Sequence, residues 1–123
     1  MKSILIADDE PHLRFVLKEI LASGDYNLYE ACDGEEALKL SIEIKPDIIV
    51  LDVAMPKLTG YEVVKKLIER NIKSKVIMLS AKAQKSDIKK GLELGAYYYM
   101  IKPFDLSEFS DIINKATLDM ERH

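Results

Sequence analysis

The feature of this sequence that most constrains its fold is the alternation of short apolar runs with longer segments of helical spacing. Runs of this kind, with little polar alternation, are typical of strands that are buried on both faces of a parallel sheet. The predicted strands are Ser3–Asp8, Tyr26–Ala31, Asp47–Asp52, Lys75–Ser80 and Tyr97–Ile101.

The segments between these runs favour helices, because their apolar residues recur three and four positions apart. Pro11 suits a first helical position, and Gly24 is expected to stop the helix that begins there. Gly91 lies inside the fourth helix and weakens it by about 1 kcal/mol relative to alanine. The other predicted helices cover residues 35–44, 61–69, 87–94 and 106–120.

Strands that alternate with helices of this length predict repeated right-handed βαβ units on a parallel sheet. The expected fold class is therefore α/β, a doubly wound five-stranded parallel sheet flanked by five helices. A chain of 123 residues suits one domain, and we expect residues 1–123 to form it.

The composition argues against several classes of protein. A net charge of −3 without a Lys/Arg run argues against direct binding of nucleic acid. Cys32 is the only cysteine, so no internal disulfide can form, and a reducing cytoplasm is expected. The first apolar run is too short for a signal peptide or a membrane span. Few amide side chains and many Lys, Glu and Ile residues favour a thermophilic source.

Charged or hydroxyl side chains stand where four of the five apolar runs stop. In open parallel sheets, ligands bind beyond the carboxyl ends of the strands, where the strand order reverses. Each of these residues alone has an ordinary explanation, such as a helix cap or a solvated surface charge. Together they predict three carboxylates, a hydroxyl and an ammonium at one rim. The residues are Asp8, Asp9, Asp52, Ser80 and Lys102.

Three neighbouring carboxylates repel one another, and either protonation or a bound cation relieves that repulsion. Mg²⁺ is the usual intracellular cation for oxygen ligands, and it leaves positions open for a phosphoryl group. Asp52 is then the predicted nucleophile, as carboxylates are in aspartyl-phosphate chemistry. Lys102 would place a positive charge, and Ser80 a hydroxyl donor, beside the phosphoryl oxygens. The rim is thus predicted to form an acyl phosphate.

The same residues lie in motifs that resemble the receiver domain of response regulators in two-component signalling, and the chemotaxis regulators in particular. The motifs are Ala7-Asp8-Asp9-Glu10-Pro11, Asp52-Val53-Ala54-Met55-Pro56 with Gly60, Ser80-Ala81-Lys82, Gly95-Ala96 and Lys102-Pro103-Phe104. The resemblance covers the whole chain. It implies the sheet order 2-1-3-4-5 and a cis bond between Lys102 and Pro103.

The resemblance also implies how the residues act. Asp52 would take its phosphoryl group from a phosphohistidine on a sensor histidine kinase or a histidine phosphotransfer protein. Ser80 and Tyr99 would form a switch pair that changes the face of the fourth helix, fifth strand and fifth helix. Such a domain is not an enzyme beyond its own phosphorylation and dephosphorylation. The implied Mg²⁺ ligands are Asp8 through water, Asp9, Asp52 and the backbone carbonyl of Ala54.

The sequence departs from the family pattern at two places. Thr59 stands where an acid, asparagine or glycine is usual before Gly60. Tyr97 and Tyr98 stand where many relatives have two acids. In regulators with winged-helix effectors, an acid at this place pairs with a basic residue of the last helix in the dimer. That dimer is therefore not expected here, and we expect a monomer. Strand alternation predicts that Tyr97 and Tyr99 share one face of the sheet and that Tyr98 lies on the other.

The upstream partner must bring its histidine to Asp52, so its docking surface is expected to surround the rim. Leu13, Val16 and Phe104 are predicted to be apolar anchors for a helical partner, because a small central cluster usually dominates such interfaces. Core packing of the helix that contains Leu13 and Val16 is the alternative explanation.

Three other assignments compete with this one. A phosphatase of the haloacid-dehalogenase type needs a second acid two residues after its nucleophile, where this chain has Ala54. A flavodoxin-like electron carrier is disfavoured because Asp8-Asp9-Glu10 would repel a flavin phosphate. The chain also fits a receiver from a longer regulator whose output domain follows His123. A stand-alone receiver is favoured over it, because nothing basic or flexible begins near the C-terminus.

Overall fold

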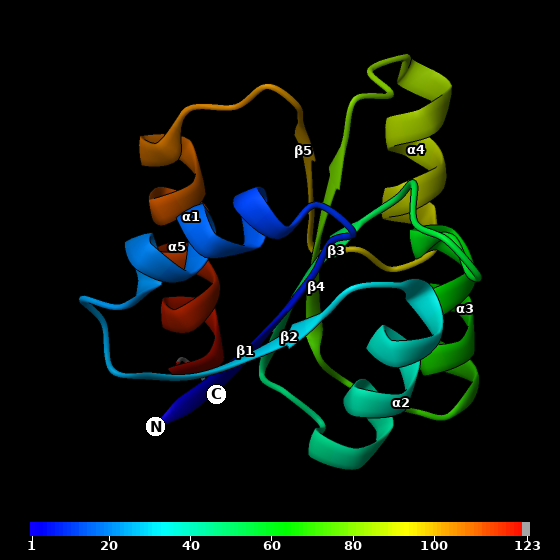
Figure 1. Cartoon of the computed structure of the whole chain (residues 1–123). Coiled ribbons are helices and arrows are strands. Elements are labelled where there is room, and N and C mark those ends of the chain that lie inside the picture. Colours follow the sequence, from blue (N-terminus) through cyan, green and yellow to red (C-terminus); the bar gives the residue numbers. More distant parts are fainter. Residues whose placement is uncertain (122–123) are drawn as a thin grey trace.

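The computed structural model describes residues 1–121, in which strands and helices alternate throughout (Figure 1). The strands are β1 (Lys2–Ala7), β2 (Tyr26–Ala31), β3 (Ile48–Asp52), β4 (Lys75–Ser80) and β5 (Tyr98–Ile101). The helices are α1 (Pro11–Leu21), α2 (Gly34–Ile44), α3 (Gly60–Glu69), α4 (Lys85–Glu93) and α5 (Leu106–Glu121). All strand pairs are parallel, in the order β2-β1-β3-β4-β5. The predicted fold class and strand order are confirmed.

Helices cover both faces of the sheet: α1 and α5 lie on one side, and α2, α3 and α4 lie on the other (Figure 1). Strand β3 shows how the sequence fills both layers. Ile48 and Val50 pack in the core under α1 and α5, whereas Ile49 and Leu51 pack in the opposite core. All four side chains are fully buried, which explains why the strand reads as an unbroken apolar run.

The ends of α1 and α2 agree with the prediction, and backbone hydrogen bonds close both of them. Helix α1 ends at Leu21, and the N–H of Gly24 then donates to the Leu21 carbonyl at 3.0 Å. Helix α2 ends in a left-handed residue, Lys45 with φ 49°, whose N–H donates to the Ser41 carbonyl at 2.9 Å. A left-handed residue without glycine leaves no simple sequence signal, because the conformation depends on the closing hydrogen bond.

The prediction that Tyr97 shares a face with Tyr99 is wrong. Tyr99 is buried in the core under α2, α3 and α4, whereas Tyr97 and Tyr98 pack against the core under α5. The reason is that β5 begins at Tyr98, so Tyr97 precedes the strand alternation. The Tyr97 hydroxyl donates to the Asp119 carboxylate of α5, and the Lys75 ammonium lies 4.7 Å from the centre of its ring.

The carboxyl-terminal helix leads to the end of the described chain at Glu121. Arg122 and His123 lie outside the described residues. The alternative of an output domain that follows His123 concerns this part of the chain and stays a prediction. Within residues 1–121, no helix combines the length and the apolar character that crossing a lipid bilayer requires.

Candidate functional site

The acidic pocket lies at the carboxyl ends of β1 and β3, where the strand order reverses. Asp8 directly follows β1, and Asp52 is the last residue of β3. Carboxylate oxygens of Asp8, Asp9 and Asp52 lie within 4.8 Å of one another. Asp8 and Asp52 are buried, and Asp9 is exposed. The sheet therefore brings together the three acids that the sequence analysis placed at one rim.

Lys102 reaches the same pocket from the end of β5. Its backbone N–H donates to the Ser80 carbonyl at 2.8 Å, and its bond to Pro103 is cis, as predicted. Its Nζ lies 3.0 Å from Asp8 Oδ2 and 3.5 Å from Asp52 Oδ2. Burial lowers the pKa of Lys102, but the hydrogen bond to Asp8 and the charge of Asp52 outweigh burial and raise it. One charged ammonium thus pairs with two of the three carboxylates, Asp8 and Asp52.

The surroundings of Asp52 disfavour its charge. Burial, and then the charge of Asp8, raise the pKa of Asp52 from 3.8 to about 6. Lys102 and the backbone N–H of Ala54, which lies 3.3 Å from Asp52 Oδ1, act in the opposite direction. A carboxylate held in this way gains from a nearby cation. Three carboxylates opposed by one ammonium are a donor set that fits a hard divalent cation such as Mg²⁺.

Ser80 completes the rim as the last residue of β4, which pairs with β3. Its side chain is buried, and its Oγ accepts a hydrogen bond of 3.0 Å from the N–H of Lys82. Ala54, two residues after Asp52, is exposed, and its N–H lies 3.3 Å from Asp52 Oδ1. Its side chain is a methyl group, which carries no polar atom.

Arg14 is a residue near the site that the sequence analysis missed. Its guanidinium donates to the Asp8 carbonyl at 2.7 Å and pairs with Glu30 at 3.1 Å. Lys18 also pairs with Glu30, and its hydrogen bond is the main cause that lowers the pKa of that carboxyl. These contacts tie the loop after β1 to α1 and to β2. In the sequence, Arg14 is only a basic residue in the second turn of α1, and such a residue is usually a surface charge.

The loop after Asp52 is shaped by Thr59 and Gly60. A Cβ atom at Gly60 would lie 2.6 Å from the Asp52 carbonyl oxygen, so only glycine lets α3 begin this close to the end of β3. Thr59 caps α3: its Oγ1 accepts from the N–H of Glu62 at 3.2 Å, and the Glu62 side chain accepts from the Thr59 N–H at 3.0 Å. The departure from the family pattern at Thr59 is therefore a capping box.

The three predicted docking residues are half-buried. Leu13 and Phe104 pack against the core under α1 and α5, and the ring centres of Phe104 and Phe109 are 6.2 Å apart. Val16 is also half-buried. The sequence analysis missed Phe15, which lies off the apolar stripe of α1 and is 59% exposed. Apolar surface is thus present on α1, and its role in docking stays a prediction.

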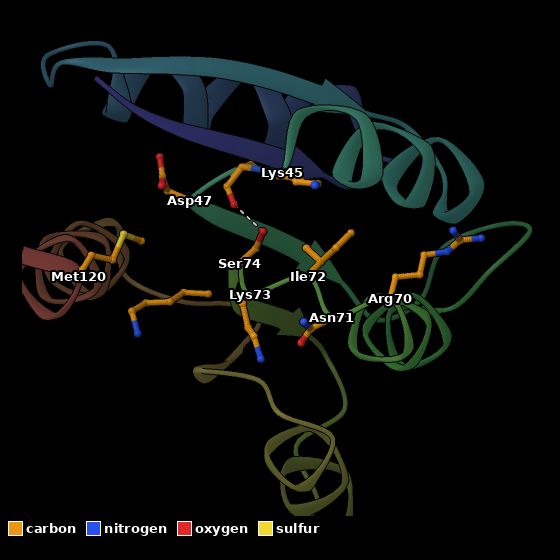
Figure 2. Close-up of a pocket in the computed structure, with 10 residues that line it drawn as sticks. Lys45, Asp47, Arg70, Asn71, Ile72, Lys73, Ser74 and Met120 are labelled. Atoms are coloured by element: carbon orange, nitrogen blue, oxygen red, sulfur yellow. Dashed lines mark hydrogen bonds between the residues drawn. The ribbon is translucent and has the colours of Figure 1, made fainter. Parts of the chain in front are cut away.

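A hollow of about 450 Å³ lies at the opposite end of the sheet, near the amino-terminal ends of β3 and β4 (Figure 2). Lys45 and Arg70 in its lining follow the carboxyl ends of α2 and α3, where positive charge is favoured. The Ser74 hydroxyl donates to the Pro46 carbonyl (Figure 2). The side chains of Arg70 and Lys73 point in different directions. Because its polar groups do not converge, the acidic pocket remains the candidate site.

Residues 4–114 match the family model of the response regulator receiver domain. The chain is 47% identical over 107 residues to the alkaline phosphatase synthesis transcriptional regulatory protein PhoP of Bacillus subtilis, covering 87% of this chain and 45% of PhoP. It is 32% identical to the chemotaxis protein CheY of Thermotoga maritima, covering 94% of this chain and 98% of CheY. It thus spans less than half of PhoP and nearly all of CheY.

A solved structure gives the same assignment. The response regulator protein TrrA of Thermotoga maritima, solved in complex with Mg(2+)-BeF, superposes with a TM-score of 0.83 at 34% identity, covering 94% of this chain and 99% of TrrA. The motifs, the strand order, the acidic pocket and the family model agree. The chain belongs to the response regulator receiver domain family, the signalling modules of two-component systems.

Proposed function

We propose that Asp52 accepts a phosphoryl group from a phosphohistidine and that this changes the surface formed by α4, β5 and α5. The observation that carries the proposal is the position of Asp52. It ends the central strand within 4.8 Å of two other acids and 3.5 Å from the Lys102 ammonium. We further propose that residues 1–123 act as one receiver domain in the cytoplasm, as a monomer.

The transfer forms one bond and breaks one bond. A carboxylate oxygen of Asp52 attacks the phosphorus, and the phosphorus–nitrogen bond of the donor imidazole breaks, with its electron pair left on the nitrogen. Asp52 must be ionised for this attack, and its pKa of about 6 leaves it ionised at neutral pH. Lys102 then neutralises charge on the phosphoryl oxygens, and the Ser80 hydroxyl donates to one of them.

Mg²⁺, when bound, would supply positive charge that stabilises the negative charge of the phosphoryl group. Asp9, Asp52 and the backbone carbonyl of Ala54 would hold it directly, and Asp8 would hold it through water. Asp8 is already oriented, since its Oδ1 accepts from the N–H of Glu10 at 2.9 Å. The related TrrA protein was solved in complex with Mg(2+)-BeF, which supports Mg²⁺ as the cation proposed here.

Ser80 and Tyr99 are the proposed switch pair. Tyr99 is buried in this structure, and its hydroxyl donates to the Lys82 carbonyl at 2.9 Å. The Ser80 hydroxyl accepts from the N–H of the same residue. A phosphoryl group on Asp52 would draw the Ser80 hydroxyl toward itself, and we propose that the loop after β4 follows.

Labelling with acetyl phosphate and Mg²⁺ tests the proposal. Intact-mass measurement should show one added phosphoryl group on the wild-type protein and none on Asp52→Asn. Asp33→Asn is the matched control, because Asp33 caps α2 outside the pocket and asparagine caps a helix equally well. Labelling of Asp52→Asn, or equal labelling of the wild type in the presence of chelator, would contradict the site.

The proposed upstream partner is a sensor histidine kinase or a histidine phosphotransfer protein, which would dock at Leu13, Val16 and Phe104. A receiver that belongs to a longer regulator is the second candidate, because the chain spans only 45% of PhoP. The mass of the natural polypeptide decides between the two. A phosphatase activity is disfavoured by Ala54, and steady turnover of an aryl phosphate would contradict that view.

A further inference from the structure

Two buried tyrosine hydroxyls hold the joint between β4 and α4, which we define as residues 82–87. The Tyr99 hydroxyl of β5 donates to the Lys82 carbonyl at 2.9 Å. The Tyr61 hydroxyl of α3 donates to the Asp87 carbonyl in the first turn of α4 at 3.2 Å. Tyr99 and Tyr61 are 7% and 8% exposed. Each hydroxyl has one proton to donate, so the two tyrosines secure opposite ends of the joint.

The joint is also connected to the acidic pocket. The N–H of Lys82 donates to Ser80 Oγ at 3.0 Å, while the carbonyl of Lys82 accepts from Tyr99. Lys82 therefore links the Ser80 hydroxyl to the Tyr99 hydroxyl. When the Ser80 hydroxyl turns to another partner, Lys82 loses its hydrogen bond to Ser80. The hydrogen bonds from Tyr99 to Lys82 and from Tyr61 to Asp87 then remain to hold the joint.

The first turn of α4 is held by the packing of Ile88 against the core and by backbone hydrogen bonds to the Gln84 carbonyl, besides the Tyr61 hydroxyl. Its N-cap residue, Gln84, makes no side-chain capping hydrogen bond. The Lys90 ammonium lies 4.4 Å from the centre of the Tyr61 ring, which gives α4 a second contact with the same tyrosine. Tyr61 thus contacts α4 twice, at the Asp87 carbonyl and at the Lys90 ammonium.

Gly91 gives Tyr99 its place beneath α4. A Cβ atom at Gly91 would lie 2.9 Å from Tyr99 Cδ2 and 3.0 Å from Met78 Sδ. The glycine that the sequence analysis treated as a weak point of the helix is therefore a packing requirement of the buried tyrosine. Any residue with a Cβ atom would push α4 away from the ring.

We propose that Tyr61 is a positioning residue of the switch, which holds the first turn of α4 against α3 and so limits how far α4 moves when Ser80 and Tyr99 rearrange. The two tyrosines lie close enough to influence each other. Burial, and then the Tyr99 hydroxyl, raise the pKa of Tyr61, so its hydroxyl keeps the proton it donates. The link to Ser80 rests on the proposed function; the hold of Tyr61 on α4 does not.

The first test uses the free protein. Tyr61→Phe keeps the ring and removes only the hydroxyl, so amide hydrogen exchange at residues 85–93 should be roughly fivefold faster, the equivalent of one ordinary hydrogen bond. Lys90→Ala removes only the cation above the ring and should give a smaller increase in the same window. Tyr29→Phe on the half-exposed face of β2 is the matched control and should change nothing there.

Two outcomes of this test would overturn the hold on α4: unchanged exchange at residues 85–93 in Tyr61→Phe, or equal acceleration along the whole chain. A double-mutant cycle with Tyr99→Phe adds an independent measure. If both hydroxyls secure one joint, their effects on exchange should differ from the product of the single effects. Simple multiplication of the two effects would contradict a shared joint.

The second test asks whether the hold matters for the switch. Tyr61→Phe should accept a phosphoryl group from acetyl phosphate as fast as the wild type, because the hydroxyl that it removes donates to the Asp87 carbonyl and not to Asp52. The change in α4 exchange between free and phosphorylated protein should fall to less than half of the wild-type change. An undiminished change would overturn the switch role. If the wild type does not label at all, the proposed function fails, and the free-protein test still decides the hold of Tyr61 on α4.

Discussion

The Lys102 ammonium donates a hydrogen bond of 3.0 Å to the Asp8 carboxylate across a sequence separation of 94 residues. The same ammonium lies 3.5 Å from Asp52, so one positive charge is shared between two acids. A divalent cation in the pocket would bind the same acids. Cation binding and the Lys102 contacts are therefore expected to oppose each other, which leaves Lys102 available to the phosphoryl oxygens.

Replacing Lys102 separates its two effects. Lys102→Ala should bind Mg²⁺ at least as tightly as the wild type in calorimetry, because a competing positive charge is gone. Its labelling by acetyl phosphate should be about 100-fold slower, since a positive charge on the phosphoryl oxygens is lost. Lys115→Ala on α5 is the control. Labelling of Lys102→Ala at the wild-type rate would show that the ammonium is not needed.

The raised pKa of Asp52 predicts a pH-dependent gain in stability when its charge is removed. Because the folded-state pKa of about 6 lies above the ordinary 3.8, ionising Asp52 destabilises the fold, and stability falls as the pH rises through 6. In chelator at pH 8, urea unfolding should find Asp52→Asn more stable by about 1–3 kcal/mol. At pH 4 the two proteins should be nearly equal. A difference that is the same at both pH values would contradict the charge effect.

Ala54 is expected to prolong the phosphoryl state, because its exposed methyl group cannot orient a water molecule beside Asp52. After labelling and removal of the donor, Ala54→Asn should lose its phosphoryl group severalfold faster than the wild type. Intact-mass measurements over time follow the loss. Ala54→Val adds bulk without a polar group and should not lose its phosphoryl group faster than the wild type. Equal rates of loss in all three proteins would contradict a role of the side chain at residue 54 in hydrolysis.

The capping box of α3 predicts a stability effect with no effect on the chemistry. Thr59→Ala should lower the free energy of unfolding by about 1 kcal/mol, because the N–H of Glu62 loses its partner. Glu62→Gln keeps both hydrogen bonds of the box and should cost little. Both variants should still label at Asp52. An unchanged free energy of unfolding in Thr59→Ala would mean that solvent replaces the cap.

Partner docking is tested by comparing two phosphodonors. Leu13→Ser and Phe104→Ser should slow transfer from a phosphorylated histidine protein that labels the wild type, while labelling by acetyl phosphate stays intact. Phe15→Ser should act in the same way at a smaller cost in stability, because Phe15 is exposed. Ile68→Ser replaces an exposed residue of α3 on the other face and is the control. If both donors slow together, the replaced residue supports the fold or the site.

The architecture and the acids of the pocket could be predicted from the amino-acid sequence. A strand that is buried on both faces can be recognised from a few consecutive apolar residues. Asp8, Asp52 and Ser80 stand where such runs end. Because carboxyl ends of parallel strands share one edge, these residues had to meet there. Chain order and local pattern contain this shared edge, whereas the strand order that makes β1 and β3 neighbours was implied by the family resemblance.

The contacts of individual side chains could not be predicted from the sequence and are seen in the three-dimensional structure. Tyr97 leaves the face of Tyr99 because β5 begins one residue later than the pattern indicates. Gly91 is required by a ring from another strand, and the Tyr61 hydroxyl finds its acceptor at Asp87, 26 residues away. Such relations depend on clearances of a few tenths of an ångström between distant segments. Hydrophobic periodicity cannot predict such contacts, because it indicates which residues are buried and not which residues they pack against.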